Sequence, residues 1–170
     1  LQLSWRKENH DSPGVVRMNR RLIILRHAQS SRDDFNVIDH DRPLDEKGIR
    51  DSAIIASEIN QRDWVPDHIF VSSSLRTTQT LDSMGSQFSK IPKTVMGELY
   101  DAKLQTVLSV IESIGEGQTG MIIGHNPSCE MLLECITGNL EIMPTCSGAL
   151  ISEIGGKWTL DQIIRPRGAK

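Results

Sequence analysis

The sequence predicts an α/β protein with three layers, in which helices cover both faces of a mostly parallel sheet. Short apolar runs of strand length alternate with longer stretches that have the apolar spacing of a helix. This alternation indicates right-handed βαβ units, which build parallel sheets. A chain of 170 residues suits one such domain, with a core large enough to need no disulfide or metal.

The composition argues against several classes of protein. A net charge of −3 offers no basic footprint for nucleic acid, and no apolar run approaches the roughly 18 residues of a membrane span. Cys129, Cys135 and Cys146 are odd in number and lack C-x-x-C spacing. We therefore expect reduced thiols in a cytoplasmic protein, and neither a disulfide framework nor a zinc site.

The amino-terminal residues 1–19 show no hydrophobic periodicity. We expect them to form a peripheral extension to a single domain over residues 20–170. The chain begins at Leu1 and not at a methionine. If residues 1–19 are the remnant of a targeting sequence, the protein is expected to be soluble inside an organelle instead.

The first strand and helix are predicted from opposite kinds of pattern. Leu22–Leu25 is a run of four apolar residues, as in a strand buried on both faces. The polar segment 29–43 follows, and it is longer than most connections between a strand and a helix. A helix is then predicted from Asp45, with apolar positions 49, 53, 56 and 59 toward the core.

The second strand and helix follow a break at Pro66. Residues 68–71 have strand character, and Ser74 is a suitable N-cap for a helix over residues 75–88. Residues 91–96 form a short extended segment.

The second half of the chain continues the alternation and closes with a hairpin. The predicted elements are a helix over 104–114 ended by Gly115, a strand at 121–123, a helix from Pro127 to Gly138, and strands at 147–154 and 158–164 joined by Gly155-Gly156. The last two strands are expected to form an antiparallel edge of the sheet.

Polar residues follow three of the predicted strands. Arg26 and His27 end the first strand, Arg76 lies just after the second, and His125 follows the strand at 121–123. Because the carboxyl ends of parallel strands share one edge, two arginines and two histidines are expected in one cleft. Guanidinium groups and helix N-termini both favour phosphate. The sequence therefore predicts a phosphate site.

Four short motifs resemble those of the histidine phosphatase superfamily, which includes the phosphoglycerate mutases, and they occur in the same order. Ala28 replaces the glycine of the first motif. The motifs are Leu25-Arg26-His27-Ala28, Ser72-Ser73-Ser74-Leu75-Arg76-Thr77-Thr78-Gln79-Thr80, Glu98-Leu99-Tyr100 and Gly124-His125-Asn126. The resemblance implies a fold like that of phosphoglycerate mutase.

A fifth block is similar to the SixA branch of that superfamily, named for a phosphohistidine phosphatase. Asp41-Arg42-Pro43-Leu44, followed by Gly48, resembles its R-P-L-x-x-x-G block. Ala28-Gln29-Ser30-Ser31 before acidic residues resembles SixA-like proteins of bacteria and plastids. The chain also lacks room for the larger helical insertions of the mutases.

The resemblance implies a phosphatase that forms a phosphohistidine on His27, with Arg26, Arg76 and His125 stabilising the transferred phosphoryl group. It also implies substrate contacts from Arg42, Ser30 and Asn126. No metal and no cofactor are expected, because fixed cations supply the electrostatic stabilisation. The expected substrate is a phosphorylated protein or a small phosphate ester, and no oligomeric state is predicted.

Glu98 matches the position of the acid that protonates the leaving group in many members of the superfamily. Asp33 and Asp34, in the polar segment after His27, are alternative acids. The resemblance implies that a SixA-type enzyme depends less on this group, since it acts on a phosphoramidate.

Three other functions remain alternatives. His40-Asp41 is an H-D pair with further aspartates nearby, which could indicate a metal-dependent phosphohydrolase. A module with the same fold could bind phosphate or dock a partner without turnover. A small-molecule phosphatase is the third alternative.

Overall fold

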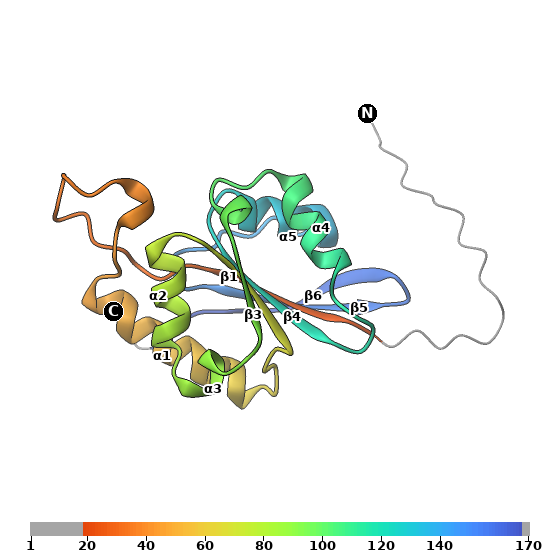
Figure 1. Cartoon of the computed structure of the whole chain (residues 1–170). Coiled ribbons are helices and arrows are strands. Elements are labelled where there is room, and N and C mark those ends of the chain that lie inside the picture. The colour runs from red at the N-terminus through yellow and green to blue at the C-terminus, as the bar shows by residue number, and fades with distance from the viewer. Residues whose placement is uncertain (1–18, 168–170) are drawn as a thin grey trace.

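The computed structural model describes residues 19–167, so the predicted extension over residues 1–19 lies outside the described residues except for Asn19. Its centre is a six-stranded sheet in the order β3-β2-β4-β1-β5-β6 (Figure 1). The strands are β1 (Arg21–Arg26), β2 (His68–Ser72), β3 (Lys93–Met96), β4 (Thr119–Gly124), β5 (Gly148–Ile154) and β6 (Lys157–Ile164). The first four are parallel, and β5 and β6 add the predicted antiparallel edge.

Helices cover both faces of this sheet, which confirms the three-layer prediction. In Figure 1 the helices α1, α2 and α3 lie below the sheet, and α4 and α5 lie above it. The helices are α1 (Glu46–Gln61), α2 (Leu75–Ser83), α3 (Ser86–Ser89), α4 (Leu104–Glu112) and α5 (Ser128–Thr137), with short 3₁₀ turns η1 (Asp39–Asp41) and η2 (Gly97–Leu99). No helix of residues 19–167 is long and apolar enough to cross a membrane.

Strand β1 divides the core into two halves. Its side chains alternate, so that Ile23 and Leu25 pack with α1 and α2, while Leu22 and Ile24 pack with α4 and α5. All four side chains are fully buried. A central strand covered on both faces therefore explains the continuous apolar run.

Two predicted helices differ in detail from the structure. Helix α2 ends at Ser83, because Gly85 has a φ of 96° that an α-helix does not allow, and α3 follows as a separate turn. In α1, Ile49 is 51% exposed and Ala53 is exposed too. Ala56 and Ile59 are buried as predicted, and Gly48, Ser52 and Ile55 are buried in place of positions 49 and 53.

Gly48 explains which face of α1 is turned toward the core. Its backbone N–H donates to the Asp45 side chain at 2.7 Å, as expected at a helix N-terminus. The Asp45 N–H donates in turn to the carbonyl of Gln29 at 3.1 Å. A Cβ at position 48 would overlap that carbonyl oxygen. The glycine thus lets the segment after His27 pack directly on the start of α1.

The register of the parallel strands places three strand ends beside one another. Arg26 of β1 pairs with Gly124 of β4, and Val71 of β2 pairs with Ile123 of β4. The residues that follow these positions therefore meet at one edge, which is the arrangement the sequence predicted. The segment between β1 and α1, orange in Figure 1, projects beyond this carboxyl edge.

Candidate active site

His27 is fixed at the carboxyl end of β1 by its own backbone. Its N–H donates to the carbonyl of Gly124 at 3.0 Å, and its carbonyl accepts from Cys146 N–H at 3.0 Å. The ring Nδ1 lies 2.8 Å from the carbonyl oxygen of Ala28. Since a carbonyl only accepts, Nδ1 carries the proton and the lone pair is on Nε2.

The His27 imidazole is neutral at physiological pH. Burial lowers its pKa to about 4, and the positive charges of Arg76, Arg26 and Arg42 act in the same direction. The hydrogen bond to Ala28 opposes this shift without reversing it. Only 8% of His27 is exposed. A neutral imidazole with its lone pair on Nε2 is the form required of a nucleophile.

Arg76 connects the two histidines. It lies in the first turn of α2, which is capped by the Ser74 side chain. Its Nε donates to His27 Nε2 at 3.3 Å, and its Nη2 lies 3.4 Å from His125 Nδ1. A guanidinium cannot accept, so His125 Nδ1 is the acceptor and its Nε2–H donates to Ser72 Oγ at 2.8 Å.

His125 faces His27 across the site, with ring centroids 5.1 Å apart. Burial lowers its pKa to about 3, and His27 and Arg76 contribute to the shift. Both histidines are therefore neutral, and the positive charge of the site comes from its arginines.

Asp39 and Tyr100 belong to the site although the sequence did not assign them to it. One Asp39 carboxylate oxygen accepts from Arg76 Nη2 at 3.1 Å and from the Tyr100 hydroxyl at 2.7 Å. The other accepts from Arg42 Nη1 at 2.9 Å. The Tyr100 hydrogen bond and the arginines lower the Asp39 pKa to about 2. An anionic group is thus held by the cations that were expected to bind phosphate.

Arg42 is positioned by the polar segment that precedes it. Its guanidinium donates to the Ser30 hydroxyl and to the carbonyl of Ser31, the latter at 3.1 Å. An isolated bridge between Ser30 and Leu44 folds the segment back on itself. The structure therefore brings Ser30 and Arg42 to the site together, as the sequence predicted.

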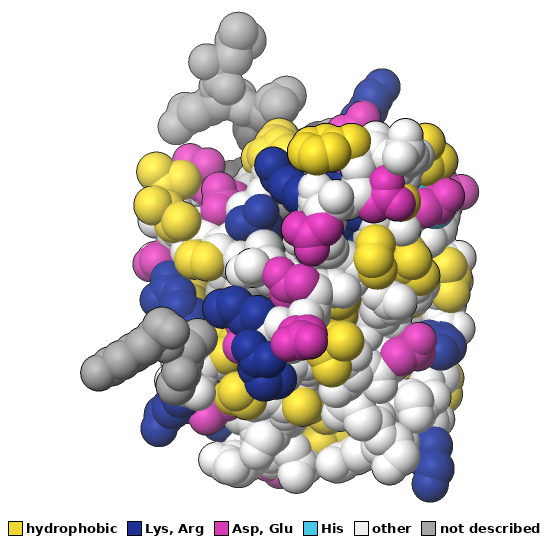
Figure 2. Space-filling view, turned by 90° about the vertical axis from the view of Figure 1, so that its left-hand side faces the viewer, with side chains coloured by type: hydrophobic (Ala, Val, Ile, Leu, Met, Phe, Trp, Pro, Cys, Tyr) yellow, Lys and Arg dark blue, Asp and Glu magenta, His cyan; other side chains and the backbone are white. Residues whose placement is uncertain are grey.

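A pocket of about 570 Å³ opens beside these groups at the carboxyl edge of the sheet. Figure 2 looks onto this face, where Lys and Arg side chains lie beside Asp and Glu side chains near the middle and hydrophobic side chains lie mostly around them. The predicted site residues that line the pocket are Arg26, His27, Ser30, Arg42, Arg76 and Asn126, together with Asp33. His125 contacts it through Arg76.

The structure places Glu98 away from the lining of this pocket, and its role as the acid stays a prediction. In turn η2 the Leu99 side chain is buried, so Glu98 points outward and is exposed. It is not among the described residues that line the pocket. Tyr100, two positions later, is the residue of this motif that reaches Asp39. Of the alternative acids, Asp33 lines the pocket and Asp34 lines a smaller neighbouring one.

Among the described residues, the H-D pair contacts its own neighbours and is not part of a metal-binding cluster. The His40 ring lies 3.1 Å from the Asp41 carboxylate and 3.0 Å from Ser73 Oγ. Over residues 19–167, no group of three or more His, Cys, Asp or Glu side chains is arranged to hold a metal ion.

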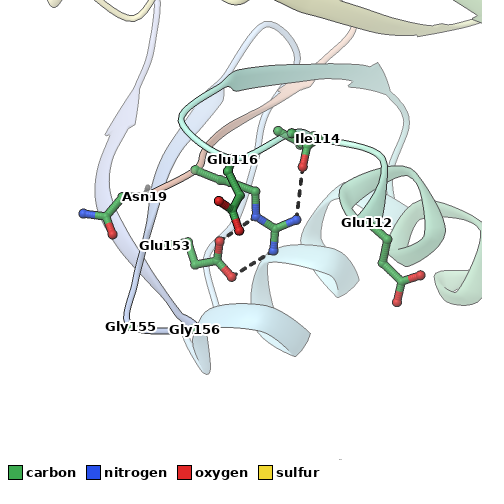
Figure 3. A pocket seen from close by; sticks show the side chains of 9 residues that line it. Asn19, Glu112, Ile114, Glu116, Glu153, Gly155 and Gly156 are labelled. Atoms are coloured by element: carbon green, nitrogen blue, oxygen red, sulfur yellow. Dashed lines mark hydrogen bonds and ion pairs between the residues drawn. The ribbon is translucent and has the colours of Figure 1, made fainter. Parts of the chain in front are cut away.

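A second pocket, of about 380 Å³, lies at the amino-terminal end of β1 (Figure 3). Its arginine, Arg20, forms a bidentate pair with Glu153 at 2.6 and 2.8 Å and donates to the carbonyls of Ile111 and Ile114. Glu112 and Glu116 also line this pocket. Because its cation is already paired and acidic groups surround it, this pocket does not suit a phosphate.

The family model of the histidine phosphatase superfamily (branch 1) matches residues 22–107. The chain belongs to the histidine phosphatase superfamily. An uncharacterized chloroplastic protein of Arabidopsis thaliana is 35% identical over 153 residues, which cover 83% of this chain and 70% of the relative. Uncharacterized proteins of Mycobacterium tuberculosis are 30% identical over 146 residues, which cover 79% of this chain and 89% of each relative. The compartment of this protein stays a prediction.

Solved structures of the superfamily share the fold. One from Agrobacterium tumefaciens, assigned as the phosphohistidine phosphatase SixA, is 31% identical, with a TM-score of 0.78 over 86% of this chain and 97% of its own. The protein histidine phosphatase SixA complexed with tungstate is 22% identical, with a TM-score of 0.75 over 88% of this chain and 99% of its own. The fold class and the resemblance to the SixA branch are thereby confirmed.

Proposed function

We propose that this protein is a phosphatase that forms a phosphohistidine intermediate on His27. The observation that carries the proposal is the contact of Arg76 with the unprotonated Nε2 of a buried, neutral His27. A nucleophile and a fixed positive charge that lie side by side suit attack on a phosphoryl group.

The first step transfers the phosphoryl group. His27 Nε2 forms a bond to phosphorus as the bond to the leaving group breaks, and the leaving group takes that electron pair and a proton. Arg76, Arg26 and Arg42 line the pocket and offset the charge of the phosphoryl oxygens. The Nδ1–H bond to Ala28 stabilises the positive ring that forms.

The proton donor in this proposal is Asp33, which lines the pocket. Asp39 is not assigned this role, because its carboxylate already accepts hydrogen bonds from Arg76, Arg42 and Tyr100.

The substrate that we propose is a phosphohistidine on a protein. Phe35 is 96% and Ile38 66% exposed in the segment that forms one wall of the pocket. Leu140 and Ile142 are 77% and 76% exposed just before Met143, whose carbonyl accepts from Arg26. A small ester would leave these apolar side chains in water, whereas a protein surface would cover them. The likeness to SixA structures supports the same class.

The experiment is a phosphatase panel with a phosphohistidine protein, phosphoserine peptides and sugar phosphates. We expect the highest kcat/KM on the phosphohistidine protein and no turnover by a folded His27→Ala variant. Preference for a sugar phosphate would favour the small-molecule alternative. Phosphate binding without turnover of any substrate would favour the binding module.

A further inference from the structure

Two buried side-chain atoms of the described residues have no hydrogen-bond partner, and both belong to residues that line the active-site pocket. They are Nε of Arg26 and Oδ1 of Asn126. Most buried polar atoms in proteins are paired, so an exception needs an explanation. One atom is a donor and the other is an acceptor, which indicates the kind of group the pocket receives.

The orientation of the Asn126 amide is determined by its neighbours. Its Nδ2 donates to Glu130 Oε1 at 2.8 Å and to the carbonyl of Met143 at 3.1 Å. Both partners are acceptors, so nitrogen and oxygen cannot be exchanged. Oδ1 is therefore a carbonyl acceptor held in place by the amide's other contacts.

Arg26 lies beside this amide. Its Nη1 donates to the same carbonyl of Met143 at 2.9 Å. The two side chains thus share one acceptor, and each presents one unpaired atom. A fully ionised phosphate can accept from Arg26, but it has no hydrogen to donate to Asn126. A water molecule has the chemistry to pair with a donor and an acceptor together, since it both accepts and donates.

We propose that Asn126 is a positioning residue, which with Arg26 orients the water that hydrolyses the phosphohistidine. This inference rests on the proposed function. In-line displacement places the leaving group and then water on the side of phosphorus opposite His27. The water accepts a hydrogen bond from Arg26 Nε and donates one to Asn126 Oδ1. These two bonds direct a lone pair of the water oxygen toward phosphorus.

The hydrolytic step is balanced without another reactant. The water oxygen forms a bond to phosphorus as the bond from phosphorus to His27 Nε2 breaks. The electron pair returns to Nε2, and the ring becomes neutral with its proton still on Nδ1. One water proton passes to a phosphoryl oxygen, and the product leaves as dihydrogen phosphate.

The test separates the two steps in Asn126→Ala by rapid quench, with acid-labile phosphate on the protein as the readout. We expect phosphorylation of His27 within about threefold of wild type and dephosphorylation at least tenfold slower, so that phosphoenzyme accumulates in the steady state. A small alcohol should also capture a larger share of phosphoryl groups than in wild type, since water loses its advantage. Asn126→Ser, whose side chain is too short to replace the carbonyl, should behave in the same way and guards against misfolding of the alanine variant.

Arg165→Ala is the matched control. Arg165 donates to the carbonyl of Ile142 at 3.2 Å, so it holds the same segment from outside the pocket, and we expect wild-type kinetics. Equal slowing of both steps in the folded Asn126 variants, or no slowing of dephosphorylation, would overturn the role of Asn126. Absence of any phosphoenzyme in wild type would instead contradict the proposed function.

Discussion

Arg76 donates through Nε to the Nε2 of His27 at 3.3 Å. The same guanidinium contacts His125 and Asp39 through its other nitrogens. One side chain therefore connects the nucleophile, the second histidine and the anionic group of the polar segment.

Replacing Arg76 tests whether catalysis depends on the several contacts of its guanidinium group or on its positive charge alone. Arg76→Lys keeps a positive charge but cannot contact both histidines, so we expect kcat/KM to fall by about 10²-fold or more. The kcat/KM of Arg76→Ala should fall at least as far. Steady-state assays on a phosphohistidine protein measure this, and near-normal activity of the lysine variant would contradict the proposed role.

Asp39 is predicted to compete with phosphate for the arginines. Asp39→Asn keeps an oxygen that accepts from Arg76 and removes the negative charge. Because the phosphate dianion then meets less repulsion, we expect the inhibition constant of inorganic phosphate to fall about three- to tenfold, which corresponds to about 1 kcal/mol. Weaker inhibition in the folded variant would indicate that Asp39 mainly orients Arg76. Asp41→Asn, a neighbour whose carboxylate contacts His40, is the control.

The buried histidines predict how stability changes with pH. The pKa of His27 is lowered from 6.5 to about 4, and that of His125 to about 3. Below pH 6.5 the unfolded chain therefore binds more protons than the folded one, and stability falls as the pH drops from 6.5 toward 4. The slope is at most about 1.4 kcal/mol per pH unit for each histidine.

Thermal unfolding from pH 7 to pH 5 measures this effect. We expect Tm to decrease over that range, and the decrease to be smaller in His27→Asn, which cannot titrate. Equal slopes in wild type and His27→Asn would show that His27 does not titrate differently in the folded state.

Gly48 affects both the stability of the fold and the position of the segment that follows His27. An added Cβ would overlap the Gln29 carbonyl, so Gly48→Ala should lose about 1–3 kcal/mol of unfolding free energy despite alanine's higher helix propensity. Activity should fall as well, because Gln29 follows the nucleophile by two residues. Ile49→Ala, at an exposed position of the same helix, is the matched control. Denaturant unfolding that leaves Gly48→Ala as stable as wild type would contradict this packing.

The sequence was informative where regular structure determines position. Arg26, His27, Arg76 and His125 could be placed together because each follows a strand of a parallel sheet. The apolar run of β1 likewise required burial on both faces, and the structure confirms it.

Residues outside regular elements were harder to place. Asp39 and Tyr100 meet only because two irregular segments fold over the same edge, and no periodicity encodes that contact. Glu98 matched a motif by spacing, but the direction of its side chain depends on how turn η2 buries Leu99. The buried face of α1 was misread at Ile49 because a backbone contact with Gly48 sets the helix rotation.

The most direct test of the account is to trap the phosphoryl group on the protein. Wild type and His27→Ala are mixed briefly with a labelled phosphohistidine protein, denatured in alkali, and digested for mass spectrometry. We predict one alkali-stable, acid-labile phosphoryl group on Nε2 of His27 in wild type and none in the variant. A wild type that releases phosphate at full rate while His27 stays unmodified, or a folded His27→Ala protein that retains turnover, would contradict the mechanism.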